Sequence, residues 1–292
     1  MHDNTAGYRL GLLLVIAATL AWSTAGLFTR MIQTDTVTLL FWRGIFGGIG
    51  VFAVACALQG RDAIRGFARL GPVGWGFAVI SGLGMLCFIT ALRLTTVAHV
   101  AIIYATVPLV AAGLGWVVLR ETPGRSALLA SLAALGGVAL MVGLGGDGSL
   151  GGDLLAFGMT LALAAMMVLS RRHPGLPIMA ASALSAVLSA LMVVPLMEGF
   201  AVSATDMALL AAFGLVNSAL GLALFSLGAR YLPPVETALI TALDAPLAPV
   251  WVWLVFSETP GGATLVGGGI VMGAVMAHLW RQGRAGRRAR PA

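Results

Sequence analysis

The sequence predicts an all-α integral membrane protein whose ten transmembrane helices form two inverted five-helix repeats, with both termini in the cytoplasm. Three observations support this fold class: an apolar composition, ten apolar segments of spanning length, and a motif that occurs twice, 137 residues apart. The chain of 292 residues is 59% hydrophobic and only 10% charged. A soluble domain of this size needs more charge to cover its surface, so we expect lipid to surround most of this chain.

The apolar runs indicate helices rather than barrel strands. Backbone polar groups inside a bilayer must bond within the protein, which leaves helices or closed barrels. Barrel strands alternate apolar and polar residues, whereas runs such as 10–20 and 97–119 are continuously apolar. A spanning helix needs about 20 residues. Ten segments are long enough: 10–31, 36–58, 71–93, 96–119, 125–144, 152–170, 176–197, 206–229, 233–256 and 261–280.

The arginines predict the orientation of these helices. Cytoplasmic loops of membrane proteins carry an excess of basic residues, and all 17 basic residues here are Arg. With the N-terminus inside, 14 of them lie on the cytoplasmic side; Arg30 and Arg93 lie outside, and Arg43 lies within the second segment. We therefore expect a multi-pass protein of a bacterial inner membrane. Its basic tail, 281–292, is expected beside anionic lipid rather than on nucleic acid.

An internal repeat divides the chain. Trp116-Val-Val-Leu-Arg-Glu-Thr-Pro-Gly124 resembles Trp253-Leu-Val-Phe-Ser-Glu-Thr-Pro-Gly261, and Pro108 matches Pro246 with a slip of one residue. We predict a first repeat over 1–146 and a second over 147–280. Five helices per copy is an odd number, so the second copy must be inverted in the membrane. Inverted repeats around a midplane site are a common architecture of secondary transporters, because similar halves can exchange inward- and outward-open conformations.

Several short motifs occur in a specific order. They are Ala21-Trp22-Ser23, Phe41-Trp42-Arg43, Ala91-Leu92-Arg93, Pro108, Glu121, Ser170-Arg171-Arg172, Pro246 and Glu258. In their order and spacing the chain resembles the drug/metabolite transporter superfamily, EamA type, over nearly its whole length. Within that superfamily it is similar to the YddG-like aromatic amino-acid exporters. One departure is Leu163, where a Trp matching Trp22 is often found.

The resemblance implies a function. Members export amino acids, other metabolites or cationic drugs through a central cavity between the two halves. For this chain it favours export of aromatic or large neutral amino acids by alternating access. A drug or cation exporter of the same fold is the alternative, and a membrane channel or sensory receptor is the competing class.

Ionisable residues deep in apolar segments are candidates for substrate contact, because charge in a bilayer is costly. Asp244 can accept a substrate ammonium group or a proton, or it can pair with Arg43. Arg43 can hold a carboxylate in its planar fork, or it can serve only in structure. His99 can titrate near neutral pH or lie at the interface.

Aromatic and polar side chains complete the predicted cavity. The aromatic candidates are Trp22, Phe88, Tyr104 and Trp251, and the polar ones are Ser23, Asn217 and Ser218; ordinary packing is the competing interpretation for the aromatic side chains. Prolines free backbone carbonyls and bend helices. Pro108, Pro246 and Pro249 are therefore predicted hinges, with a static kink as the alternative. The spacings Gly44-x-x-x-Gly48 and Gly269-x-x-x-Gly273 predict close helix packing.

Other classes find little support in the sequence. With no Lys there is no P-loop, and Gly143–Gly148 matches G-x-G-x-x-G without the strand and helix that a dinucleotide site requires. Neither a nucleophile–base set nor a His-Glu-x-x-His pattern occurs. We expect no catalytic or metal residues and no cofactor. The expected partners are a small-molecule substrate and the lipid bilayer, with the monomer as the functional unit.

Overall fold

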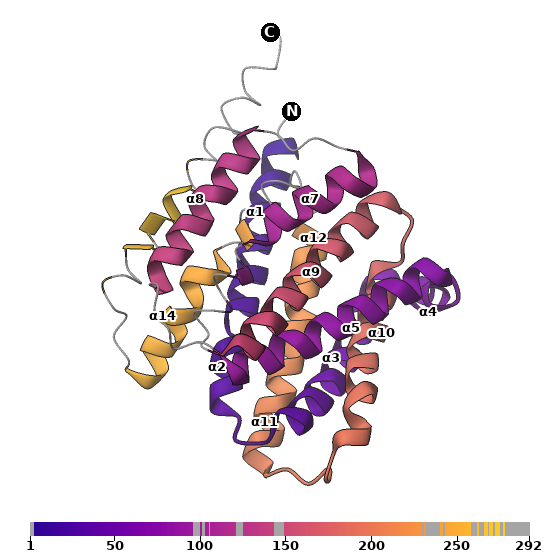
Figure 1. The fold of residues 1–292 in the computed structure, drawn as a ribbon. Coiled ribbons are helices and arrows are strands. Elements are labelled where there is room, and N and C mark those ends of the chain that lie inside the picture. The colour runs from indigo at the N-terminus through magenta and orange to yellow at the C-terminus, as the bar shows by residue number, and fades with distance from the viewer. Residues whose placement is uncertain are drawn as a thin grey trace.

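A computed structural model describes residues 3–95, 106–120, 125–142, 149–228 and 243–257, with short stretches at 100, 103–104, 231, 240–241 and within 262–277. Within these residues every regular element is a helix (Figure 1). The first half contains α1 (Asp3–Ser23), α2 (Ala25–Met31), α3 (Thr36–Gln59), α4 (Arg61–Ala68), α5 (Gly71–Leu94), α7 (Val107–Leu119) and α8 (Arg125–Val142). The second half contains α9 (Leu150–Arg172), α10 (Ile178–Val193), η1 (Val194–Leu196), α11 (Ala204–Phe213), η2 (Gly214–Leu220), α12 (Gly221–Gly228) and α14 (Asp244–Phe256).

Six helical stretches of the described residues are long and apolar enough to cross a membrane. They are Gly7–Met31, Thr36–Gln59, Gly71–Leu94, Leu150–Ser170, Ile178–Leu196 and Ala204–Phe225. These correspond to the first, second, third, sixth, seventh and eighth predicted segments. The fourth, fifth, ninth and tenth segments are covered by shorter helices or lie partly outside the described residues.

Helix boundaries follow local chemistry. The Asp35 side chain caps α3 by accepting a hydrogen bond from the Thr38 backbone N–H, at 2.9 Å. Burial raises the pKa of Asp35, but hydrogen bonds from Thr38 and Val37 outweigh it and hold this pKa below its usual value. Gly60 ends α3 with φ of 57°, a left-handed conformation that glycine adopts at little cost.

The helix α4 was expected as a loop after the second segment. Its buried side consists of Ala63 and Gly66, which face α10 near Met179 and Ala180. Its outer side carries Arg61 and Arg65. It is too short and too polar to span, and it lies across one end of the bundle (Figure 1).

Glycines set the spacing between α3 and its neighbours. A Cβ on Gly44 would lie 2.6 Å from the Ala186 backbone oxygen of α10, and one on Gly48 would lie 2.7 Å from Val187. The first predicted glycine pair therefore does mediate close helix packing. Gly269 and Gly273 behave differently, because a Cβ on either would meet no described atom within 4 Å.

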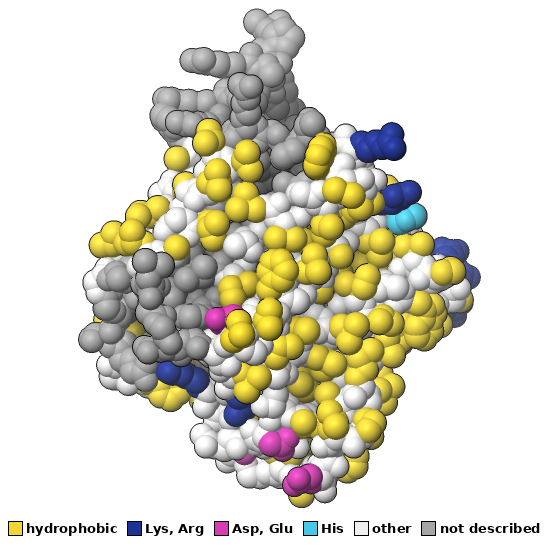
Figure 2. Space-filling view, viewed as in Figure 1, with side chains coloured by type: hydrophobic (Ala, Val, Ile, Leu, Met, Phe, Trp, Pro, Cys, Tyr) yellow, Lys and Arg dark blue, Asp and Glu magenta, His cyan; other side chains and the backbone are white. Residues whose placement is uncertain are grey.

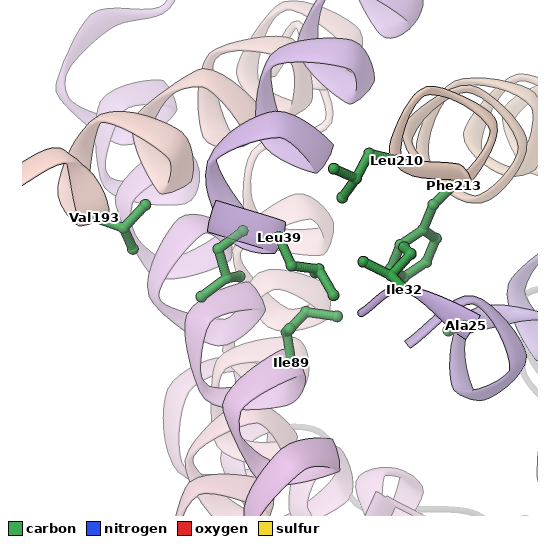
Figure 3. Packing of buried hydrophobic residues seen from close by; sticks show 8 residues of the cluster. Ala25, Ile32, Leu39, Ile89, Val193, Leu210 and Phe213 are labelled. Carbon is green, nitrogen blue, oxygen red and sulfur yellow. The ribbon is translucent and has the colours of Figure 1, made fainter. Parts of the chain in front are cut away.

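The largest apolar cluster joins the two halves of the chain. Leu39 of α3 and Ile89 of α5 meet Leu210 and Phe213 of α11, and Figure 3 shows these side chains pointing toward one another. Phe28 stacks on Phe213 with ring centroids 5.2 Å apart. This cluster lies toward the end of the bundle where α11 begins, which we call the α11 end.

Loops at the α11 end are tied together across the two halves. The Gln33 backbone N–H donates to Asp206 at 3.0 Å. Arg93 donates to the backbone oxygens of Ile32 and Thr34, both at 3.2 Å, and the Thr95 hydroxyl bonds Asp153 at 2.9 Å. The opposite end, where α4 lies, is called the α4 end. Figure 2 shows Arg and His side chains gathered over the α4 end and acidic side chains at the α11 end.

Candidate functional site

The first transmembrane helix is interrupted at Thr24, where α1 ends and α2 begins. The Ser23 hydroxyl donates to the Leu20 oxygen at 2.8 Å, and the Thr24 hydroxyl donates to the Ala21 oxygen at 2.6 Å. Such hydroxyls compete with the helical backbone for hydrogen bonds and can bend a helix. The segment 10–31 was expected as one helix, so this break is a finding of the structure.

Asn217 holds this break from the second half. Its amide nitrogen donates to the Ala21 and Trp22 backbone oxygens, at 3.3 and 3.1 Å. Asn217 lies in the π-helix η2, a wider turn that often marks functional positions. The predicted polar candidate is therefore buried and bonded to the backbone beside Trp22.

Arg43 completes this network. One guanidinium nitrogen donates to the Asn217 side-chain oxygen at 2.9 Å, and the guanidinium lies 4.6 Å from the Phe213 ring centroid. Arg43 is only 3% exposed, and its Nε has no hydrogen-bond partner. Among the described residues it makes no ion pair with a carboxylate, so the pairing with Asp244 that we considered is not present. The structure shows Arg43 bridging α3 to η2.

Trp251 connects α14 to the same break. Its indole N–H donates to the Ser23 hydroxyl at 2.7 Å. Ser23 thus bonds α14 with one lone pair and the α1 backbone with its proton. Five of the predicted site residues therefore form one connected cluster around the break, namely Trp22, Ser23, Arg43, Asn217 and Trp251.

Two further breaks occur at matching positions in the two halves. The Thr106 N–H bonds the Ile103 oxygen at 3.1 Å just before α7, and the Leu243 N–H bonds the Ile240 oxygen at 3.1 Å just before α14. Both helices then run for 13 residues and end at left-handed residues, Arg120 and Ser257. Every one of these positions is displaced by 137 residues.

The prolines lie at the starts of these two helices. Pro108 is the second residue of α7, and Pro246 is the third residue of α14. Pro249 falls in the second turn of α14. Near the Pro108 break, the Ile103 oxygen accepts hydrogen bonds from the Thr106 and Thr160 hydroxyls, at 2.6 and 3.3 Å. Side chains therefore supply partners at this break, as hydrocarbon requires.

Asp244 and Tyr104 lie at these two breaks. Asp244 is the first residue of α14, where the positive end of the helix dipole favours a carboxylate. The Tyr104 hydroxyl lies within electrostatic range of the Asp244 carboxyl. Both side chains are partly accessible. Asp244 and Trp251 are seven residues apart on α14, about 10 Å along one helix face.

The structure places the other predicted side chains as follows. Phe88 packs on the apolar cluster at the α11 end, and Ser218 faces α3, where its hydroxyl lies 2.9 Å from the position of a Cβ on Gly47. Trp22 packs on Phe225, with ring centroids 5.1 Å apart, and against Gly221. His99 lies outside the described residues, as do Glu121, Glu258, the motif at 143–148 and the tail at 281–292.

Two residues of the cluster around the Thr24 break were not predicted from the sequence. Phe213 supports the Arg43 guanidinium, and Thr24 marks the helix break. The adjacent pair Ser23-Thr24 inside an apolar run was a usable signal for the break, because both hydroxyls can bond backward to the helix. No periodicity in the sequence distinguishes Phe213 from other apolar residues of its segment.

Comparison with known proteins gives one family and one fold. The model of the EamA-like transporter family matches residues 9–143. No curated protein matches the sequence. A solved structure, described only as the crystal structure of a protein, is 18% identical to this chain with a TM-score of 0.73, covering 91% of this chain and 94% of its own. At this identity the likeness shows that the two chains share a fold.

Proposed function

We propose that this chain, which carries an EamA-like transporter family domain over residues 9–143, is a secondary transporter that exports amino acids, above all aromatic or large neutral ones. Members of that family are membrane transporters of small substrates, and the apolar helices make this chain a multi-pass membrane protein. In our proposal it lies in a bacterial inner membrane with both termini inside, and it works by alternating access as a monomer.

The matched breaks support two inverted repeats over 1–146 and 147–280. Identical turns before α7 and α14, equal helix lengths and equal left-handed ends are what a duplicated unit would retain. The gathering of Arg61, Arg65, Arg69 and Arg172 at the α4 end supports a cytoplasmic location for that end. Discontinuous helices at the repeat interface typically form the substrate site of such transporters.

The observation that carries the substrate proposal is Asp244. A carboxylate within the bilayer needs a cation or a proton, and among the described residues Asp244 has no basic partner. The ammonium group of an amino acid meets that need. Tyr104, within electrostatic range of Asp244, and Trp251, seven residues further along α14, offer aromatic surfaces to the substrate side chain.

Arg43 has a different role in this proposal. Its guanidinium is already engaged by Asn217 and Phe213, and it is almost fully buried. We therefore assign Arg43 to positioning the α1 break through Asn217 rather than to holding a substrate carboxylate. In this proposal, backbone N–H groups at the interrupted helices bind the carboxylate group of the substrate.

The test is counterflow of labelled phenylalanine, tryptophan and leucine into proteoliposomes that hold the purified protein. Asp244→Asn removes the charge at nearly constant volume, and we expect the initial rate to fall about ten-fold or more, since charged hydrogen bonds contribute about 1.5–3 kcal/mol. Asp62→Asn is the control, because Asp62 is exposed on α4 and pairs only with Arg65. Equal rates for the two variants would refute the role of Asp244.

The same vesicles separate the alternatives. Saturable transport of a lipophilic cation such as tetraphenylphosphonium, without amino-acid transport, would assign the chain to the drug and cation exporters. A pH gradient that accelerates counterflow in the wild type but not in Asp244→Asn would identify Asp244 as the proton site of an antiporter. Absence of transport for every solute would favour the channel or receptor class.

A further inference from the structure

A basic hollow opens on the α4 end of the bundle, away from the proposed substrate site. It measures about 390 Å³ and is lined by Arg69, Leu70, Val73, Arg172 and the segment 173–177. Arg69 ends α4, and Arg172 ends α9. The ionisable lining residues are Arg69, Arg172 and His173, and no carboxylate is among them.

The lining of this hollow is preformed. The loop between α9 and α10 is closed by the Leu176 N–H, which donates to the His173 oxygen at 3.0 Å, and Pro174 and Pro177 restrict its backbone. The Arg69 N–H donates to the Arg65 oxygen at 3.1 Å, which fixes the end of α4. Both arginine side chains are exposed, so a ligand can reach them without unfolding of either helix.

Basic residues at helix ends have a simpler use, because they offset the negative end of the helix dipole. Offsetting the helix dipole does not explain why the ends of α4 and α9, from different halves of the chain, meet around a hollow. The surroundings also point to a ligand. Leu70, Val73 and Leu176 line the hollow beside the basic residues, and Trp75 of α5 is 51% exposed.

The combination of charge and exposed apolar surface indicates what the ligand is. Because α4 lies at one end of the bundle with basic residues on its outer side, these residues stand where the headgroups of anionic lipids are expected. Exposed Trp residues are enriched at the same level. We propose that the hollow formed by Arg69, Arg172 and His173 binds the phosphate group of an anionic phospholipid whose acyl chains lie against Val73 and Leu176.

The proposal assigns the charge to a lipid rather than to free phosphate, because the apolar side chains beside the hollow have no use in binding an inorganic ion. It is independent of the transported substrate. It also holds for either orientation of the chain, since the hollow lies at a bilayer surface in both.

The experiment is native mass spectrometry of the full-length protein released from nanodiscs of equal phosphatidylglycerol and phosphatidylcholine. We expect the wild type to retain phosphatidylglycerol in preference to phosphatidylcholine. The double variant Arg69→Gln/Arg172→Gln should lose this preference, with an affinity about thirty-fold lower, since each basic residue near an anionic surface contributes about a five-fold gain. Both residues are exposed, so thermal unfolding should be little changed.

The matched control is Arg9→Gln/Arg120→Gln. It removes the same charge at two other exposed positions, neither of which lines the hollow. Retained selectivity in this control with loss in the first variant supports the proposal. Equal selectivity in wild type and both variants overturns it. Inorganic phosphate at millimolar concentration is added in a second arm: displacement of the lipid by phosphate alone would overturn the assignment to a lipid.

Discussion

At the scale of single residues, the main feature is a buried charge with neutral partners. Arg43 donates to Asn217 and lies over Phe213, and Asn217 in turn holds two carbonyls at the α1 break. One amide side chain of η2 thus bonds a cation from α3 and two backbone acceptors from α1. Its removal should therefore cost more than the removal of an ordinary buried polar group.

The corresponding prediction concerns Asn217→Leu. This change removes the partner of the Arg43 guanidinium and of the Trp22 carbonyl, whereas the Ala21 carbonyl keeps the Thr24 hydroxyl, and we expect a loss of about 2–3 kcal/mol in the free energy of unfolding. Ser185→Ala is the control, because it breaks a buried neutral bond to the Ser81 hydroxyl of 2.7 Å and should cost about 1 kcal/mol. Reversible unfolding in mixed micelles measures both. A loss for Asn217→Leu no larger than the control would contradict the bridging role of Arg43.

At the scale of elements, glycines allow α3 to pack closely against both α10 and η2. Gly44 and Gly48 approach α10, and Gly47 and Gly50 approach η2. Helices pack this closely in membranes where small residues let backbones meet. The close spacing of α3, α10 and η2 therefore depends on the absence of a Cβ atom at these four glycines.

This packing predicts opposite effects of one substitution at two glycines. Gly44→Ala places a methyl group 2.6 Å from the Ala186 oxygen, so the helices must separate, and we expect a loss of about 1–3 kcal/mol. Gly76→Ala on α5 meets nothing within 4 Å and should be neutral or stabilise by about 0.5–1 kcal/mol. Thermal denaturation in detergent compares the two. Equal melting temperatures would show that α3 can move away from α10 without cost.

At the scale of the whole molecule, the α11 end is one of the places where the two halves of the chain meet. An apolar cluster lies there beneath a layer of hydrogen bonds that join the loops at 32–34 to Asp206 and Arg93. Alternating access requires one end to be closed while the other admits solute. The contacts at the α11 end are those that must break for that end to open.

Labelling of an introduced cysteine tests this closure. In a background with Cys56 and Cys87 replaced by Ala, Leu209→Cys places a thiol at the edge of the apolar cluster. Asp206→Ala removes the acceptor of the Gln33 N–H, so we expect a membrane-impermeant maleimide to label the thiol several-fold faster. Glu198→Ala is the control, since Glu198 is exposed near the same end. Equal labelling in both variants would argue against a closing role for Asp206.

The sequence predicted the described spans well because their ends are chemically marked. The third segment was expected over 71–93, and α5 covers Gly71–Leu94, beginning at Gly71 with its positive φ and ending before the polar Thr95-Thr96 pair. The break at Thr24 and the π-turn at Asn217 were not predicted. Both occur at a polar pair inside an otherwise apolar segment, and the contact that joins them links residues 195 positions apart in the sequence.

The sequence predicted several residues of the candidate site but not the contacts between them. Ser23, Asn217 and Trp251 were singled out as polar or aromatic residues in apolar segments, and the structure joins them. Which of them bond one another depends on how the helices pack. Arg43 illustrates this limit, because charge alone suggested Asp244 as its partner, whereas the fold brings Asn217 to it.

The buried guanidinium of Arg43 has an electrical consequence. A charge at this depth stands within the field of an energised membrane, where moving one elementary charge across 100 mV is worth about 2.3 kcal/mol. Because glycines let α3 pack closely on α10 and η2, we expect the Arg43 charge to keep its position, so that the field does no work on it. Asp244 begins an interrupted helix, and under the proposed function a cation carried past it would cross the field. We therefore expect any voltage dependence of transport to arise at Asp244 of α14 and not at Arg43 of α3.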